Sequence, residues 1–147
     1  MGHRVDFYIL QDQNPPETFA CAIAGKILRQ GLKIHVHTES REAAVALDDF
    51  MWTYRDISFL PHQMAGDSDQ PGTPITIGWQ ETAPADGGVL INLGAEIPDF
   101  AADFARIIEI VAAYDPLRGQ ARDRYRQYRE QGYEMHNHDI DANYADV

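Results

Sequence analysis

Val89-Leu90-Ile91-Asn92-Leu93 decides the fold, because four of these five consecutive side chains are apolar. A strand with one solvated face alternates apolar and polar residues, whereas a strand covered by helices on both faces is apolar almost throughout. This stretch therefore predicts an inner strand of a parallel sheet that lies between two layers of helices.

Strands and helices alternate on both sides of this stretch. Runs of β-branched and aromatic residues predict further strands over Val5–Leu10, Lys33–Thr38, Ile57–Leu60 and Ile75–Trp79. Apolar residues at helical spacing predict helices from about Thr18 to Gly31, from Arg41 to Trp52 behind a Ser40 cap, from Asp99 to Tyr114, and from Leu117 to Gln131. The alternation predicts a Rossmann-like three-layer α/β sandwich with a mostly parallel central sheet.

The length of 147 residues predicts a single domain. We expect residues 1–135 to form this α/β domain, with a long surface loop at Pro61–Pro74, and the polar residues 136–147 to form a flexible tail. No apolar run reaches the ~18 residues that span a bilayer, and the first residues lack the apolar region of a signal peptide. The chain is therefore expected to be soluble and cytoplasmic.

Charge and loop composition argue against two functions that such a fold often has. The net charge of -11 opposes direct nucleic-acid binding, which depends on lysine and arginine contacts to phosphates. The turn after the first strand, Gln11–Pro16, contains no glycine, and a dinucleotide site needs glycine there so that the backbone can approach the pyrophosphate. We expect no catalytic residues and no cofactor. A Rossmann-like nucleotide-dependent enzyme is the alternative.

The remaining candidates for chemistry are one cysteine and two histidine pairs. Cys21 lies in an apolar run without a neighbouring base, which favours a buried packing thiol. His35 and His37 alternate on one strand face and could share a metal, but no third ligand is adjacent in the sequence. His136 and His138 could bind a metal only from the expected flexible tail, which is a poorly preorganised site. Structural roles are favoured for all five, and no metal is expected.

Five of the twelve lysine and arginine residues lie between Arg118 and Arg129, and all five are arginine. Arg118, Arg122 and Arg126 are four residues apart, so they line one stripe of the predicted last helix, with Tyr125 beside them. Arginine binds carboxylates bidentately and stacks on flat groups. The stripe suits a small acidic peptide with an apolar or aromatic residue. The alternative is a solvated helix whose arginines pair with acidic residues of the same chain.

Two aromatic residues lie in apolar segments near a predicted loop. Trp52 ends the helix that begins after Ser40, and Phe59 belongs to the predicted strand at Ile57–Leu60. Burial in the core is the favoured interpretation for both. The alternative is that they form the apolar wall of a pocket.

Several blocks of the sequence resemble the chi subunits of bacterial DNA polymerase III. These blocks are Val5–Leu10, Leu47–Thr53, Ser58–Gly66, Pro98–Phe100 and Ala121–Arg129. The resemblance runs from about Val5 to Met135, with strands and helices in the same order. The middle block and the last helix together make it fairly specific.

The resemblance implies a fold without nucleotide binding or catalysis, and two protein partners. One partner is the psi subunit, which links chi to the clamp loader. The other is the acidic C-terminal tail of single-stranded DNA-binding protein. The implied tail-binding residues are Arg118, Arg122, Tyr125 and Arg126, with Trp52 and Phe59 as pocket candidates.

Overall fold

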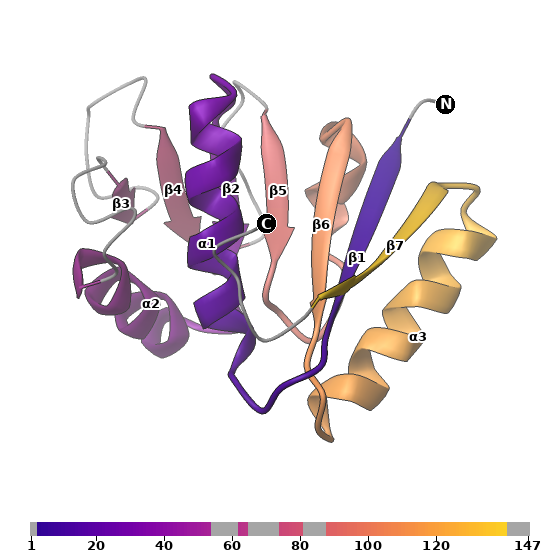
Figure 1. Cartoon of the computed structure of the whole chain (residues 1–147). Coiled ribbons are helices and arrows are strands. Elements are labelled where there is room, and N and C mark those ends of the chain that lie inside the picture. Colours follow the sequence, from indigo (N-terminus) through magenta and orange to yellow (C-terminus); the bar gives the residue numbers. More distant parts are fainter. Residues whose placement is uncertain (1–2, 54–61, 65–73, 81–87, 141–147) are drawn as a thin grey trace.

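The computed structural model describes residues 3–53, 62–64, 74–80 and 88–140. They form an α/β sandwich, as the sequence predicts (Figure 1). The strands are β1 (Arg4–Leu10), β2 (Ile34–His37), β3 (His62–Met64), β4 (Ile75–Gly78), β5 (Val89–Asn92), β6 (Arg106–Val111) and β7 (Glu134–Ile140). The helices are α1 (Pro16–Arg29), α2 (Arg41–Thr53), the 3-10 helix η1 (Asp99–Asp103) and α3 (Leu117–Glu130). The strand order is β3-β4-β2-β5-β6-β1-β7, and every described pair is parallel.

Two apolar cores lie on the two faces of this sheet. The first core packs under α1 and α2 and includes Phe19, and the second packs under α3 and η1 and includes Phe100. Successive residues of β1 point into different cores, Phe7 into the second and Tyr8 into the first. Figure 1 shows α1 crossing in front of the sheet and α3 lying at the end of the sheet near β7.

The stretch that predicts an inner strand is β5. Val89, Leu90 and Ile91 are almost fully buried, and they alternate between the two cores. Cys21 in α1 is buried, as predicted for a packing thiol. Removal from water raises the pKa of this thiol to about 12, which disfavours the reactive thiolate. Both predictions are confirmed.

The predicted helix from Asp99 to Tyr114 is wrong. The chain forms only the short η1 there and continues as β6, which lies between β5 and β1 in the sheet. Ile107 and Ile108 are both fully buried, one in each core. Consecutive apolar residues on opposite faces are the pattern of an inner strand, and this pattern overrides the approximate helical spacing.

The flexible tail expected from residue 136 is wrong for residues 136–140. These residues belong to β7, which pairs in parallel with β1 along all seven of its positions. β7 contains mainly polar side chains because it is the last described strand at this end of the sheet, with partly solvated faces. Residues 141–147 lie outside the described residues.

Two smaller predictions concern the middle of the chain. The predicted strand at Ile57–Leu60 lies outside the described residues. The predicted loop at Pro61–Pro74 contains the short strand β3, which pairs with β4. The Ser40 cap is confirmed, because the Ala43 amide donates a hydrogen bond to Ser40 Oγ at 3.1 Å.

Candidate functional site

One side of α3 packs into the molecule and the other faces solvent. Tyr128 is fully buried, and its ring meets the Phe7 ring edge-on at 5.9 Å between centroids. Arg124 is only 5% exposed and therefore points inward, whereas the sequence pattern gave no reason to separate it from the other arginines. The helix thus has one buried arginine and an outer arginine stripe.

Arg124 is held by a buried carboxylate. Its Nε donates to Glu109 Oε1 at 2.8 Å, and one of its terminal nitrogens donates to the Ala95 carbonyl at 2.9 Å. Glu109 Oε2 accepts from the Tyr128 hydroxyl and the Asn92 amide, both at 2.8 Å. Complete burial raises the pKa of Glu109, although the charge of Arg124 and these hydrogen bonds oppose that rise. This network fixes the position of α3 on the sheet.

A hollow of about 230 Å³ lies between α3 and the strands β1, β6 and β7. Its lining residues are Phe7, Ile9, Val111, Arg118, Ala121, Arg122, Tyr125 and Asn137. We call this hollow the α3 groove. Its floor is apolar, and two arginines of the stripe stand on its helical side.

Tyr125 lines the α3 groove, and three contacts hold its side chain in position. Its ring packs edge-on against Phe7 at 4.9 Å. Its hydroxyl accepts a hydrogen bond from the Asn137 side chain at 3.3 Å. The Arg129 guanidinium lies 6.0 Å from the ring centroid. The ring therefore offers an ordered aromatic surface in the groove, one helical turn beyond Arg122.

The structure brings together three of the six residues predicted for the site. Arg118, Arg122 and Tyr125 line the α3 groove. Arg126 is not among the lining residues, is 62% exposed, and pairs with Asp123 on the surface of the helix. The prediction that Arg126 shares one site with the other two arginines is therefore not met by the groove.

Trp52 lies on α2, far from this groove in the fold. α2 packs on β3 and β4 at one end of the sheet, whereas α3 packs on β6 and β7 at the other (Figure 1). The two helices also cover opposite faces. Trp52 is therefore not a wall of the α3 groove, and at 52% exposure it is not buried in the core either, so the favoured interpretation is wrong for this residue. Phe59 lies outside the described residues.

The groove residues that sequence reasoning missed come from the strands. Phe7 and Ile9 alternate on β1, which shows that they share a face but not which helix covers that face. Val111 belongs to the segment predicted as a helix, and Asn137 to the segment predicted as a flexible tail. No signal in the sequence alone places these residues beside α3.

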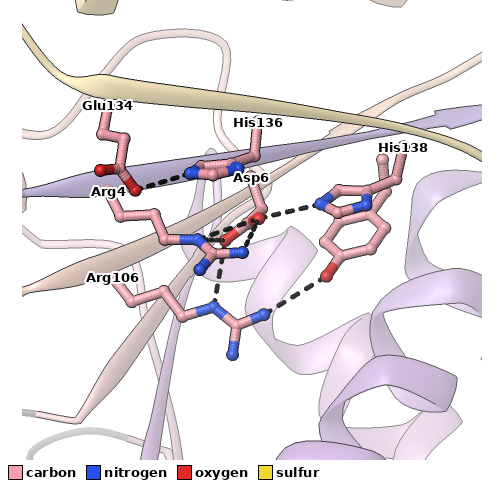
Figure 2. Close-up of polar contacts among 7 residues, drawn as sticks. Arg4, Asp6, Arg106, Glu134, His136 and His138 are labelled. Carbon is pink, nitrogen blue, oxygen red and sulfur yellow. Dashed lines mark hydrogen bonds and ion pairs between the residues drawn. The ribbon is translucent and has the colours of Figure 1, made fainter.

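A polar cluster on the other face of the sheet holds β7 in place (Figure 2). Asp6 is fully buried and accepts hydrogen bonds from Arg4 at 2.9 Å, Arg106 at 3.1 Å and His138 at 2.9 Å. Burial acts to raise the pKa of Asp6, but these three hydrogen bonds outweigh it and the net shift is downward. Tyr8 stacks on the His138 ring at 4.6 Å. We call these five residues the Asp6 cluster.

The histidine pairs have structural contacts. His35 and His37 share a face, and each ring packs edge-on against Phe100. His35 Nδ1 lies 2.7 Å from the Thr76 hydroxyl, and burial lowers the pKa of His35 to about 4. His136 pairs with Glu134 at 2.6 Å. Within the described ranges, three or more potential metal-ligating side chains do not gather at any point.

In the described part of the chain, every helix is too short or too polar to span a bilayer.

The fold and the groove together define a small parallel α/β protein with an arginine-lined, apolar surface hollow. The chain also matches the family model described as DNA polymerase III chi subunit, HolC, over residues 2–136.

Relatives of the chain bear the same name, DNA polymerase III subunit chi. The Pseudomonas aeruginosa relative is 35% identical over 92% of this chain and 95% of its own length. The Haemophilus influenzae relative is 36% identical over 95% and 99%, and the Escherichia coli relative is 31% identical over 88% and 92%. The chain belongs to the DNA polymerase III chi subunit family, and the resemblance found in the sequence is confirmed.

Proposed function

We propose that the chain is a non-catalytic adaptor of the replication machinery whose α3 groove binds the acidic C-terminal tail of single-stranded DNA-binding protein. One observation carries this proposal: in a chain with a net charge of -11, two arginines and an ordered tyrosine surround an apolar hollow. Family membership supports a role within the polymerase assembly.

The chemistry of the groove suits an acidic peptide with an aromatic end. Arg118 and Arg122 would bind its carboxylates, while a phenylalanine ring would leave water against Phe7, Ile9 and Tyr125. Burying one phenylalanine side chain contributes about 1.5–3 kcal/mol, and each partly exposed charge pair adds about 0.2–1 kcal/mol. After the cost of association, an affinity in the micromolar range is expected.

An adaptor also needs a second surface for the partner that connects it to the clamp loader. Val45 and Trp52 are seven residues apart on α2, so they lie on one side of the helix, and they are 40% and 52% exposed. Exposed apolar side chains that gather on one helix side favour protein contacts. We assign psi pairing to this side of α2, which leaves the α3 groove open for the peptide.

Fluorescence polarisation of a labelled acidic peptide ending in Asp-Ile-Pro-Phe tests the groove. Wild-type protein should bind it saturably, with weaker binding at higher salt. Arg122→Ala should lower the affinity about tenfold or more, because it removes a cation from the groove. Arg126→Ala is the matched control, since it removes an arginine of the same helix that does not line the groove.

Two outcomes would overturn the assignment. Equal losses in both arginine variants would indicate a diffuse attraction to the helix rather than a site in the groove. No binding at protein concentrations near a millimolar would rule out the peptide-binding function.

A different experiment tests the alternative function. A clear rise in melting temperature with nucleotides would favour a nucleotide-dependent enzyme.

A further inference from the structure

Asn137 contacts the hydroxyl of Tyr125 from the strand side of the α3 groove. Its side-chain Nδ2 donates a hydrogen bond to Tyr125 Oη at 3.3 Å, and both residues line the hollow. The Tyr125 ring is itself fixed by its edge-on packing against Phe7 at 4.9 Å. The hydroxyl oxygen therefore has a defined place in the groove.

The backbone around Asn137 is fixed by β1. Asn137 lies opposite Phe7 in the parallel register of β1 and β7. The next residue, His138, points to the other face of the sheet, where its ring bonds to Asp6 at 2.9 Å. Contacts on both faces of the strand thus keep the Asn137 side chain at the groove wall.

The direction of the hydrogen bond between Asn137 and Tyr125 decides what the hydroxyl offers to a ligand. A tyrosine hydroxyl has one proton to donate and lone pairs that accept. Because Asn137 supplies the proton of this hydrogen bond, the Tyr125 proton is not used in it and turns away from the amide. The α3 groove therefore presents a hydroxyl donor one helical turn from Arg122.

We propose that Asn137 is a positioning residue of the α3 groove, which directs the Tyr125 hydroxyl proton towards the terminal carboxylate of the bound peptide. This inference rests on the proposed function of the groove. In a peptide that ends in phenylalanine, the ring and the terminal carboxylate belong to the same residue. A ring on the apolar floor therefore brings that carboxylate to the donors of the same hollow, the Arg122 guanidinium and the Tyr125 hydroxyl.

This arrangement predicts selectivity for a free carboxylate over a carboxamide. A carboxylate only accepts hydrogen bonds, so it suits a site made of guanidinium and hydroxyl donors, whereas a carboxamide is neutral and brings donors of its own. Hydrogen bonds to charged groups are also stronger than those between neutral groups. The Tyr125 hydroxyl should therefore contribute more to binding of the carboxylate form.

The test titrates two labelled peptides that end in Asp-Ile-Pro-Phe, one with a free carboxylate and one with a C-terminal amide. Wild-type protein should bind the acid form at least about tenfold more tightly, measured by fluorescence polarisation. Tyr125→Phe should lower this ratio of affinities about fivefold, because the ring remains and only the hydroxyl donor is lost.

Asn137→Asp should lower the ratio about tenfold or more, because an aspartate accepts the Tyr125 proton and adds a negative charge beside the bound carboxylate. Gln127→Glu is the matched control. It adds the same charge at an exposed position of α3 that does not line the groove, and it should keep the wild-type ratio. Asn137 is also exposed, so its variants should fold and melt as wild type does.

Asn137→Ala separates positioning from a purely structural role of the strand wall. In the wild-type background it should lower the ratio about threefold, because the hydroxyl proton loses its fixed direction. In the Tyr125→Phe background it should leave the ratio unchanged, because there is no hydroxyl to direct.

Two results would overturn the positioning role and leave peptide binding in place. They are equal losses of the ratio in both backgrounds, and wild-type ratios in every Asn137 variant. Failure of the wild-type protein to bind either peptide would instead reject the proposed function of the groove, and the positioning role with it.

Discussion

At the scale of the residue, identical arginines on one helix have different roles. Arg124 is buried and bonds to Glu109, whereas Arg126 lies in solvent and pairs with Asp123. A buried cation is stabilised only while its carboxylate partner is present, and the same holds for the carboxylate. An exposed pair contributes little because water and salt screen it.

Replacing these two arginines should therefore have very different effects on stability. Arg124→Ala leaves the Glu109 carboxylate buried without its cation and should lower the free energy of unfolding by about 3–5 kcal/mol. Arg126→Ala should lower it by less than about 1 kcal/mol. Urea unfolding followed by circular dichroism measures both. Similar values for the two variants would contradict the structural role of Arg124.

His35 should make stability depend on pH below neutrality. Burial lowers the pKa of His35 from 6.5 to about 4, so the folded protein keeps it neutral where the unfolded chain protonates it. The stabilising contribution is complete above pH 6.5 and falls as the pH drops towards 4. The loss should be about 3.5 kcal/mol at most, at roughly 1.4 kcal/mol for each pKa unit.

The variant His35→Gln removes this titration. Unfolding free energies measured between pH 7 and pH 4 should fall less steeply in the variant than in wild type. A residual slope is expected from His37, since burial also lowers its pKa while Glu39 opposes the shift. Identical slopes in the two proteins would exclude His35 as the titrating group.

At the scale of the element, β7 forms a strand because of its contacts with neighbouring residues, although its own composition does not predict one. Its residues are mostly polar and predict a tail, but β1 supplies the backbone partners and the Asp6 cluster supplies polar contacts. β6 shows the opposite case, because its apolar residues fit a helix or a strand by spacing alone. Only its place between β5 and β1 settles which one forms.

Asp6→Asn should loosen β7 without changing the volume at this position. The substitution removes the charge that Arg4, Arg106 and His138 share, so amide exchange in Glu134–Ile140 should accelerate about tenfold or more. Glu134→Gln is the control, since its bond to His136 lies on the surface. Equal exchange in wild type and Asp6→Asn would show that backbone pairing alone holds the strand.

The lowered pKa of Asp6 adds a pH dependence to the same experiment. A carboxyl group with a depressed folded-state pKa stabilises the fold above its unfolded value, near 3.9, and this contribution is lost as the pH falls through the folded value. Wild-type β7 should therefore lose protection below about pH 4. The Asp6→Asn variant should show little change over that range.

At the scale of the whole molecule, the sheet separates two surfaces. The α3 groove and the exposed side of α2 lie at opposite ends of the sheet and on opposite faces (Figure 1). With the sheet between them, a partner bound at one of the two proposed surfaces would not obstruct a partner at the other, which suits the proposed adaptor function.

Substitutions on these surfaces should therefore separate the two proposed interactions. Trp52→Ala should weaken psi binding at least tenfold and leave the affinity for the acidic peptide within twofold of wild type. Arg122→Ala should do the reverse. Titration calorimetry with each partner measures both affinities. Loss of both interactions in either variant would show that the surfaces are not independent.

The sequence by itself determined the class of fold and the candidate helix. The apolar run of β5, the Ser40 cap and the spacing of Arg118 and Arg122 are local patterns, and local patterns report backbone period and which side chains share a face. The tertiary structure alone decided that Arg124 turns inward, that β7 extends the sheet and that Trp52 lies away from the groove. The reason is that these outcomes depend on which strand each element packs against, and residues distant in the sequence set those contacts.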